Sequence, residues 1–273
     1  MSQMGVGDKV TREYAKSDPE GKIVGTRWVF VKKGDKVRCR LVAQEFAGKD
    51  KREDLYAGTP PLSATRYLLS DSVSRESSGC GDARASGPWG PTRKKSSRKL
   101  MVVDVKRAFL HGYCTRSIYI ELPSSESQGG KYVGKLVRAL YGTRDAPLAW
   151  QTVVKKDMKE LGFEECKVTN GVFTHSERDL RAVAHVDDFL LSGELHDLLW
   201  FRDKLLEKYE LKVQVAGWDQ EDDKELSFLG RVIRLTPTGI ELEGDDKHVG
   251  LLEEEWGMTN CNPVPTPYVK PVG

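Results

Sequence analysis

The chain has 273 residues, enough for one large domain or two modest ones. Its 43 basic and 41 acidic residues give a net charge of +2, so charge balance alone neither indicates nor excludes nucleic-acid binding. No apolar run approaches the ~18 residues of a membrane span, the N-terminus lacks the apolar region of a signal peptide, and the five cysteines show no CxxC spacing. We therefore expect an intracellular protein with reduced thiols and without a membrane partner, a disulfide framework or a zinc site.

The first third of the chain predicts a β-hairpin and then a helix. Residues 1–21 are polar and aperiodic, and we expect a flexible lead-in. Residues 22–46 are β-forming on both sides of Lys33-Gly34-Asp35, a turn signal, and predict a hairpin. Residues 62–77 carry apolar side chains at helical spacing. Residues 78–99 are rich in Gly, Ser, Pro, Arg and Lys, which predicts a basic loop or disordered insert.

The middle of the chain predicts two strands and a long helix. Residues 100–112 begin as a buried strand that ends near Lys106, and residues 117–123 alternate as a second strand. Residues 134–163 predict a strand or turn and then a helix with Pro147 in its first turn and Gly162 at its end. The stripe expected to face the core comprises Trp150, Val153, Val154, Met158 and Leu161.

The remaining elements complete an α+β order. We expect strands within 170–175 and 180–193, a helix over 196–211, a two-stranded hairpin over 225–245 and a short helix over 247–258. The β-α-β-β-α-β order of the middle region matches a split βαβ, ferredoxin-like core.

Two adjacent carboxylates stand out in the apolar stretch "AHVDDFLL". Asp187 and Asp188 are costly to bury in a strand, and a hairpin turn or a metal site at a strand end would each explain them. Asp104 is the only acid in the earlier apolar strand, and adjacent inner strands of one sheet would bring the three acids together. Such carboxylates repel one another unless a divalent cation lies between them, and oxygen ligands favour Mg²⁺ or Mn²⁺. Two such ions can clamp an in-line phosphoryl transfer.

Several segments carry a resemblance that extends from residue 22 to residue 267. In chain order they are "RWVFVKKGDKVRCRLVAQEF" (27–46), "TPPLSATRYLLS" (59–70), "VDVKRAFLHG" (103–112), "KLVRALYGTRDAPLAW" (135–150), "HVDDFLL" (185–191), "FLGRVIR" (228–234) and "LLEEEWGMTNCNPVPTP" (251–267). Together they resemble the reverse transcriptase of Ty1/copia-type LTR retrotransposons.

The resemblance implies a right-hand polymerase with a fingers β-hairpin, a ferredoxin-like palm and a partial thumb. Fingers would span 22–99 with the insert at 78–99, the palm 100–223, and the end of the palm and start of the thumb 224–273. It implies template-directed DNA synthesis from dNTPs on an RNA or DNA template with a primer, using two Mg²⁺ or Mn²⁺ ions. It also implies integrase and RNase H regions in a parent polyprotein, and a cytoplasmic virus-like particle.

The resemblance also implies roles for individual residues. Asp104, Asp187 and Asp188 would be catalytic and metal-binding, and the backbone carbonyl of Val105 would face a metal. The residues that would contact the dNTP are Arg40, Lys33 or Lys32, Phe109, Tyr141 and Gly142. Phe109 would select against a ribose 2′-hydroxyl, and Arg38 shares a strand face with Arg40. Arg144 and His185 would contact nucleic acid.

Three departures from the family pattern leave alternatives open. His185 stands where the family usually has Tyr, Asp145 stands where it usually has Gln, and residues 78–99 exceed what the family needs. Asp145 would place a negative charge near phosphates and weaken binding. The alternatives are a catalytically decayed fragment that retains at most nucleic-acid binding, a two-metal nuclease built on the same acids, and a purely structural domain.

Overall fold

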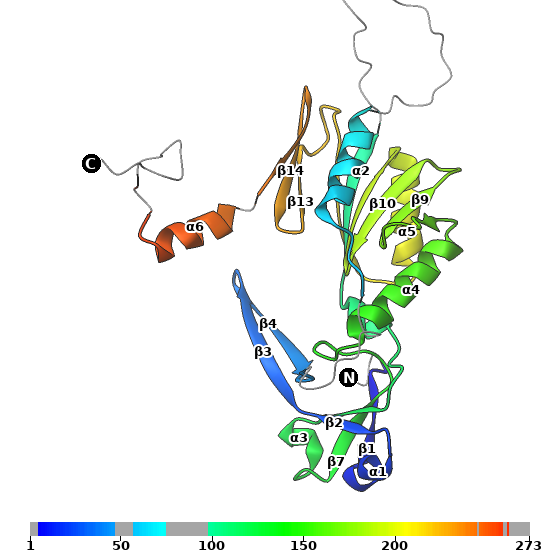
Figure 1. The fold of residues 1–273 in the computed structure, drawn as a ribbon, viewed down its shortest axis with the longest axis vertical. Coiled ribbons are helices and arrows are strands. Elements are labelled where there is room, and N and C mark those ends of the chain that lie inside the picture. The colour runs from blue at the N-terminus through cyan, green and yellow to red at the C-terminus, as the bar shows by residue number, and fades with distance from the viewer. Residues whose placement is uncertain (1–4, 47–56, 75–97, 245, 259–260, 262–273) are drawn as a thin grey trace, which may run out of the picture.

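The computed structural model describes residues 5–46, 57–74, 98–244, 246–258 and 261. The fold is α+β, as predicted, and three parts follow one another along its long axis: a small sheet, a β-hairpin and a larger layered body (Figure 1). Within these described ranges, no helix is long and apolar enough to cross a membrane.

A six-stranded antiparallel sheet forms the centre of the larger body. Its spatial order is β12 (Leu211–Ala216), β5 (Lys99–Val105), β11 (Asp188–Gly193), β10 (Leu180–His185), β9 (Val172–His175) and β8 (Glu164–Glu165). Helix α4 (Ala146–Glu160) lies between β5 and β10 in the chain, and α5 (Leu195–Leu206) lies between β11 and β12. Four strands and two helices therefore have the predicted β-α-β-β-α-β order, with the first strand, β5, between the fourth and the third. The fourth strand, β12, was not predicted, because the helix expected over 196–211 ends at Leu206 and β12 begins at Leu211.

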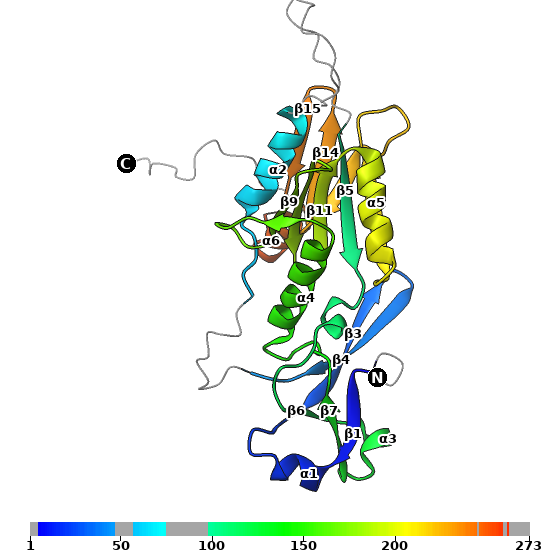
Figure 2. The ribbon, with the colours of Figure 1, turned by 90° about the vertical axis from the view of Figure 1, so that its right-hand side faces the viewer.

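The two faces of this sheet are buried by different layers. On one face, α4 and α5 pack on alternate strand residues that include Met101, Val103 and Leu191. On the other face, Leu100, Val102 and Leu190 pack against α2 (Leu62–Ser74) and a three-stranded sheet. Figures 1 and 2 show α2 and the pair α4 and α5 on opposite sides of the central strands. Because alternate strand residues point to opposite faces, both layers are needed to cover the apolar strands.

The predicted helix boundaries and stripe are confirmed in α4. Pro147 lies in its first turn, and Gly162 follows its end with a φ of +87°. Trp150, Val154 and Met158 are buried, and the other two predicted stripe residues, Val153 and Leu161, pack against the same core while partly exposed.

The fingers region begins earlier than predicted. Strands β1 (Gly7–Thr11), β7 (Tyr132–Leu136), β6 (Ile118–Glu121) and β2 (Lys22–Val24) form a four-stranded sheet in that order, flanked by α1 (Arg12–Ser17) and α3 (Ser124–Ser127). The prediction of a flexible lead-in over 1–21 is therefore wrong for β1 and α1. Strand β1 forms because it pairs with β7, and no local apolar pattern marks it in the sequence. Two strands of this sheet, β6 and β7, lie within residues 100–223, which were predicted to form the palm.

The hairpin predicted over 22–46 is confirmed. Strands β3 (Thr26–Lys33) and β4 (Lys36–Ala43) pair around Gly34-Asp35, and Gly34 has a φ of +60°. Tight hairpin turns need such left-handed residues, which Gly adopts without steric cost.

The C-terminal elements differ in one respect from the prediction. Residues 225–245 form three strands rather than two: β13 (Glu225–Phe228), β14 (Arg231–Thr236) and β15 (Gly239–Glu243). Leu229 and Gly230 make the additional turn with φ values of +52° and +68°. Helix α6 (Asp246–Glu255) follows as predicted. Of the predicted insert over 78–99, residues 78–97 lie outside the described residues, and Lys99 already belongs to β5.

Candidate functional site

The three predicted acids converge at one end of β5 and β11. Asp104 and Asp188 are direct partners across this antiparallel pair. Asp187 lies in the two-residue loop that joins β10 to β11, and His185 and Asp188 face each other where that loop begins and ends. The alternatives left open for "AHVDDFLL" are thus compatible, because the acids occupy a hairpin turn that is also the end of a buried strand.

The hairpin turn has an unusual backbone. Val186, its first loop residue, has a φ of +56°, in the left-handed region where two-residue turns commonly carry Gly. The indole N–H of Trp150 donates to the Val186 carbonyl at 2.5 Å. The Val105 backbone N–H donates to the Asp187 carbonyl at 2.9 Å. The turn is therefore attached both to α4 and to the strand that carries Asp104. The role predicted for the Val105 carbonyl stays a prediction.

The acids form a site with an excess of negative charge. Burial, together with the charges of Asp187 and Asp104, raises the pKa of Asp188 to about 6. Burial and the charge of Asp104 likewise raise the pKa of Asp187, although Arg40 and His185 oppose this effect. Both pKa shifts show that the folded site disfavours its own ionised carboxylates.

The hairpin of β3 and β4 brings Arg40 near enough to these acids for its charge to lower the pKa of Asp187. The Arg40 guanidinium lies 5.1 Å from the ring centre of Tyr141. Phe109, in the short 3₁₀ helix η2 (Ala108–His111), is half-buried with its ring centre 4.9 Å from that of Tyr141. The three predicted nucleotide-contacting residues Arg40, Tyr141 and Phe109 therefore form one continuous surface beside Asp187.

A pocket of about 600 Å³ opens between the hairpin and η2. Four basic side chains line it: Arg38, Arg40, Lys106 and Arg107. Glu210 pairs with Arg107 at 2.5 Å and also with Lys106. Lys106 and Arg107 were not predicted to contact a ligand, although both directly follow the acid-bearing strand β5.

Gly142 makes a close backbone contact within the protein that was not predicted. Its φ is +88°, and a Cβ there would lie 2.0 Å from the Ala43 carbonyl oxygen. The Ala43 N–H donates to the Tyr141 carbonyl at 2.8 Å, and the Glu45 N–H donates to the Gly142 carbonyl at 3.3 Å. Gly142 thus allows a close approach to the base of the β3–β4 hairpin, and its contact with a dNTP stays a prediction.

The other predicted contact residues are placed less closely. Lys32 lies opposite Val37, so it is on the other face of the hairpin from Arg40. Lys33 lies opposite Lys36 at the hairpin tip, and its side chain is outside the described part of the structure. The Arg144 backbone N–H donates to a Glu45 carboxylate oxygen at 2.9 Å. Direct contacts of these residues with a nucleotide or nucleic acid stay predictions.

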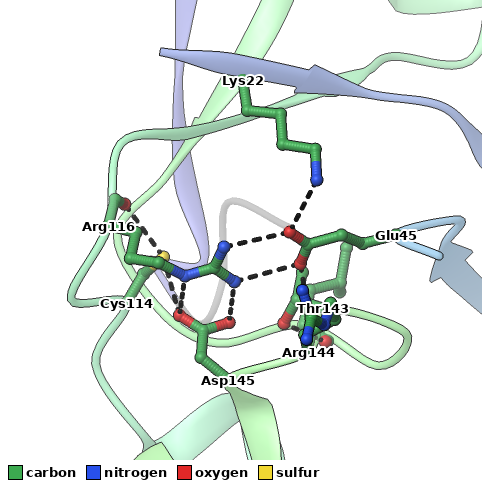
Figure 3. A network of polar contacts seen from close by, with 8 residues as sticks. Lys22, Glu45, Cys114, Arg116, Thr143, Arg144 and Asp145 are labelled. Atoms are coloured by element: carbon green, nitrogen blue, oxygen red, sulfur yellow. Dashed lines mark hydrogen bonds and ion pairs between the residues drawn. The ribbon is translucent and has the colours of Figure 1, made fainter. Parts of the chain in front are cut away.

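An ion network joins Asp145 to Arg116, Glu45 and Lys22 (Figure 3). Arg116 donates to both carboxylate oxygens of Glu45 at 3.0 Å and lies 2.9 Å from an Asp145 oxygen. Lys22 also reaches Glu45, at 3.1 Å. The side chains of Glu45 and Asp145 are 0% and 3% exposed.

Asp145 therefore does not present its charge to phosphates. It is buried against Arg116, and the expectation that it weakens nucleic-acid binding by direct repulsion is wrong. The same contacts hold the pKa of Glu45 at about 2, because the hydrogen bonds from Arg116, Arg144 and Lys22 outweigh the cost of burial. No local pattern identifies this network, because its members come from distant parts of the chain.

The acids are not gathered as a ready-made metal site. Among the residues that the structure describes, no three His, Cys, Asp or Glu groups lie close enough to hold a metal ion. The chemistry nevertheless fits a divalent cation, because two carboxylates on facing strands and a third in the adjoining turn carry charge that little in the site neutralises. Assignment of the individual ligands stays a prediction.

Comparisons with known proteins identify the family. A profile described as "Reverse transcriptase (RNA-dependent DNA polymerase)" matches residues 94–270, more than half of the chain. The chain is 30% identical over 262 residues to the Retrovirus-related Pol polyprotein from transposon RE1 of Arabidopsis thaliana, covering 90% of the chain and 16% of that polyprotein. The polyprotein from transposon RE2 of the same plant is 28% identical over 262 residues, again with 16% of its length covered.

Solved structures give weaker likenesses. The foamy viral protease-reverse transcriptase in complex with dsDNA has a TM-score of 0.47 and 16% identity, covering 95% of this chain and 45% of that one. The telomerase from Candida albicans has the same TM-score and 12% identity, covering 93% and 53%. The assignment therefore rests on the sequence matches, in which the chain spans about a sixth of the polyproteins' length. Together with the sheet that brings its acids to one turn, they show that this chain belongs to the reverse transcriptase family, as a domain of the Ty1/copia type.

Proposed function

We propose that this chain adds deoxynucleotides to a primer 3′-hydroxyl along an RNA or DNA template, with divalent metal ions at Asp104, Asp187 and Asp188. The observation that carries the proposal is the pairing of Asp104 with Asp188 beside the surface formed by Arg40, Tyr141 and Phe109. A structural domain gains nothing from carboxylates that raise one another's pKa.

The metal ions would be Mg²⁺ or Mn²⁺, since carboxylate oxygens are their preferred ligands. When bound, such ions supply charge stabilisation to the phosphate oxygens and activate the attacking hydroxyl. The protein supplies the anionic site itself. Val105 and Trp150 hold the acid-bearing turn, and β5 and β11 hold Asp104 and Asp188 opposite each other.

The basic pocket would bind the triphosphate. Guanidinium groups bind phosphate oxygens in a bidentate manner, and Arg38 and Arg40 lie on the same face of β4. Phe109, whose ring is tilted against that of Tyr141, would lie under the sugar and exclude a 2′-hydroxyl. Because this selection depends on the shape of Phe109, a shorter side chain at this position should weaken the discrimination against ribonucleotides more than it lowers the rate of deoxynucleotide addition.

The relatives' names support a polyprotein context. The matched proteins are Pol polyproteins from transposons, so we propose that this chain corresponds to one segment of such a polyprotein. Integrase and RNase H neighbours, and residence in a cytoplasmic particle, remain predictions.

Primer extension tests the proposal. The chain would be incubated with poly(rA)–oligo(dT), dTTP and either Mg²⁺ or Mn²⁺, alongside Asp187→Asn. Extension by the wild type that the variant loses would support polymerase activity at this acid turn. A folded wild-type chain that binds primer–template without extending it would favour the decayed fragment, and cleavage of the template strand would favour a nuclease.

A further inference from the structure

The loop that carries Asp187 is held in a conformation that its own sequence disfavours. Val186 has a φ of +56°, and a β-branched residue with positive φ is a genuine outlier. Such conformations persist only where surrounding contacts over-determine them. The residues that supply these contacts therefore control where the adjacent acids lie.

Two hydrogen bonds attach the loop, and they come from different elements. Asp187 accepts from the Val105 N–H of β5, a bond between neighbouring strands that needs no particular side chain. Val186 accepts from the indole N–H of Trp150 on α4 at 2.5 Å. Only the second bond depends on a side chain that a substitution can remove.

Trp150 is itself firmly placed. It is 1% exposed, and its ring packs edge-on against Tyr209 with ring centres 5.5 Å apart. The Tyr209 hydroxyl in turn donates to Asp157, another residue of α4. His111, which follows the acid-bearing strand, lies with its ring centre 6.1 Å from that of Trp150. The indole N–H thus has little freedom to turn away from the Val186 carbonyl.

We infer that Trp150 is a positioning residue for polymerisation, which fixes the left-handed turn at Val186 and so sets Asp187 and Asp188 against Asp104. The catalytic part of this inference rests on the proposed function, whereas the attachment of the turn does not. Trp150 touches no reacting atom, and it acts through the backbone of the turn.

Trp150 would also be buried if it were only a core residue, so a matched control is needed. Trp218 supplies one, because its indole N–H likewise donates to a backbone carbonyl, that of Thr236, at 3.1 Å. It packs on the opposite face of the sheet with β14 and β15. Phe at either position keeps an aromatic ring and removes one N–H donor.

The experiment compares Trp150→Phe with Trp218→Phe in two readouts. In steady-state primer extension, Trp150→Phe should lower kcat by between about 10-fold and 100-fold with little change in the KM for dTTP, as expected when reacting groups are misplaced by about 1 Å. Trp218→Phe should leave both constants near wild type. Equal effects of the two variants, or an unchanged kcat for Trp150→Phe, would overturn the inference.

Amide hydrogen exchange gives the second readout, which needs no activity. Residues 184–188 should exchange faster in Trp150→Phe than in wild type or Trp218→Phe, and unchanged exchange there would overturn the inference. If wild type extends no primer, the proposed function fails, and this readout alone decides whether Trp150 holds the turn. If Trp150→Phe does not fold, the exchange rates of the indole N–H protons are measured in the wild type instead. Trp150 should then exchange far more slowly than the exposed Trp256, and equal rates would refute the attachment.

A rescue variant separates positioning from general stability. Asn tolerates the left-handed region far better than Val, so Val186→Asn should recover part of the lost kcat in a Trp150→Phe background. Recovery of melting temperature without recovery of kcat would count against positioning.

Discussion

Replacing Arg116 by Met should destabilise the fold by leaving buried charge without a partner. Arg116 donates to both Glu45 oxygens at 3.0 Å and to Asp145 through Nε at 3.2 Å. After the change, Glu45 keeps Lys22 at 3.1 Å and the Arg144 N–H at 2.9 Å. Asp145 loses its charged partner while its side chain is 3% exposed.

The magnitude follows from this imbalance. Removing one partner of a buried ion pair costs about 3–5 kcal/mol, mostly through the charge left behind. Because Glu45 retains two partners and Asp145 carries most of the loss, we expect about 3 kcal/mol for Arg116→Met. Adding Asp145→Asn should recover roughly half of this loss, since the stranded charge is then absent.

Urea unfolding followed by circular dichroism measures the effect. Arg234→Met is the control, because Arg234 pairs with Glu225 and Glu243 on the exposed face of the three-stranded sheet, where ion pairs contribute little. An unfolding midpoint that moves no further in Arg116→Met than in Arg234→Met would refute the reasoning. So would a double variant that is no more stable than Arg116→Met.

Three further predictions concern pH, the fingers contact and the acid site. The pKa of Glu45 is about 2 in the fold, against an ordinary value of 4.5. The ionised carboxylate therefore contributes its full share of the unfolding free energy above pH 4.5, and this share is lost as the pH falls toward 2. In urea titrations, the difference in stability between wild type and Glu45→Gln should close over that range. Gly142→Ala should raise the KM for dTTP and lower the stability of the fold, because its Cβ would clash with Ala43. Gly34→Ala is the control: Gly34 is also at positive φ but has open space around its Cβ, so this change should cost only about 1–2 kcal/mol in urea unfolding. Equal losses of unfolding free energy in the two variants would contradict the clash with Ala43. Asp188→Asn should reduce primer extension by at least about 100-fold. The same change should raise the melting temperature at pH 7, because the raised pKa of Asp188 shows that the folded state disfavours the ionised carboxylate. A lower melting temperature would contradict this expectation.

Local periodicity predicted the long helix α4 and strand β5 correctly, but it missed β12, whose first residue was assigned to the preceding helix. The stripe through Trp150 and Met158 identifies the core face of α4, because helical spacing depends only on neighbouring residues. The convergence of Asp104 with Asp188 was also predictable, since few sheet topologies are compatible with the β-α-β-β-α-β order.

Features that depend on tertiary pairing were not predictable in this way. Strand β1 is a short edge strand that gains its order from β7, and strand propensity varies strongly with such context. The Arg116 network joins residues 71 and 29 positions apart in the chain, and a charge at such separation has no local signature. The attachment of Val186 by Trp150 was missed for the same reason, because the stripe assigned that indole to the core and gave no role to its N–H.

The guanidinium between Glu45 and Asp145 also restricts the order in which this segment can change during evolution. Losing Arg116 first leaves the buried carboxylate of Asp145 without its charged partner, whereas replacing Asp145 by Gln first leaves the bidentate pair of Arg116 with Glu45 intact. A lineage that exchanges both residues therefore has one path with a small loss of stability and one that passes through a destabilised intermediate. The effect of the residue at position 145 thus depends on the residue at position 116.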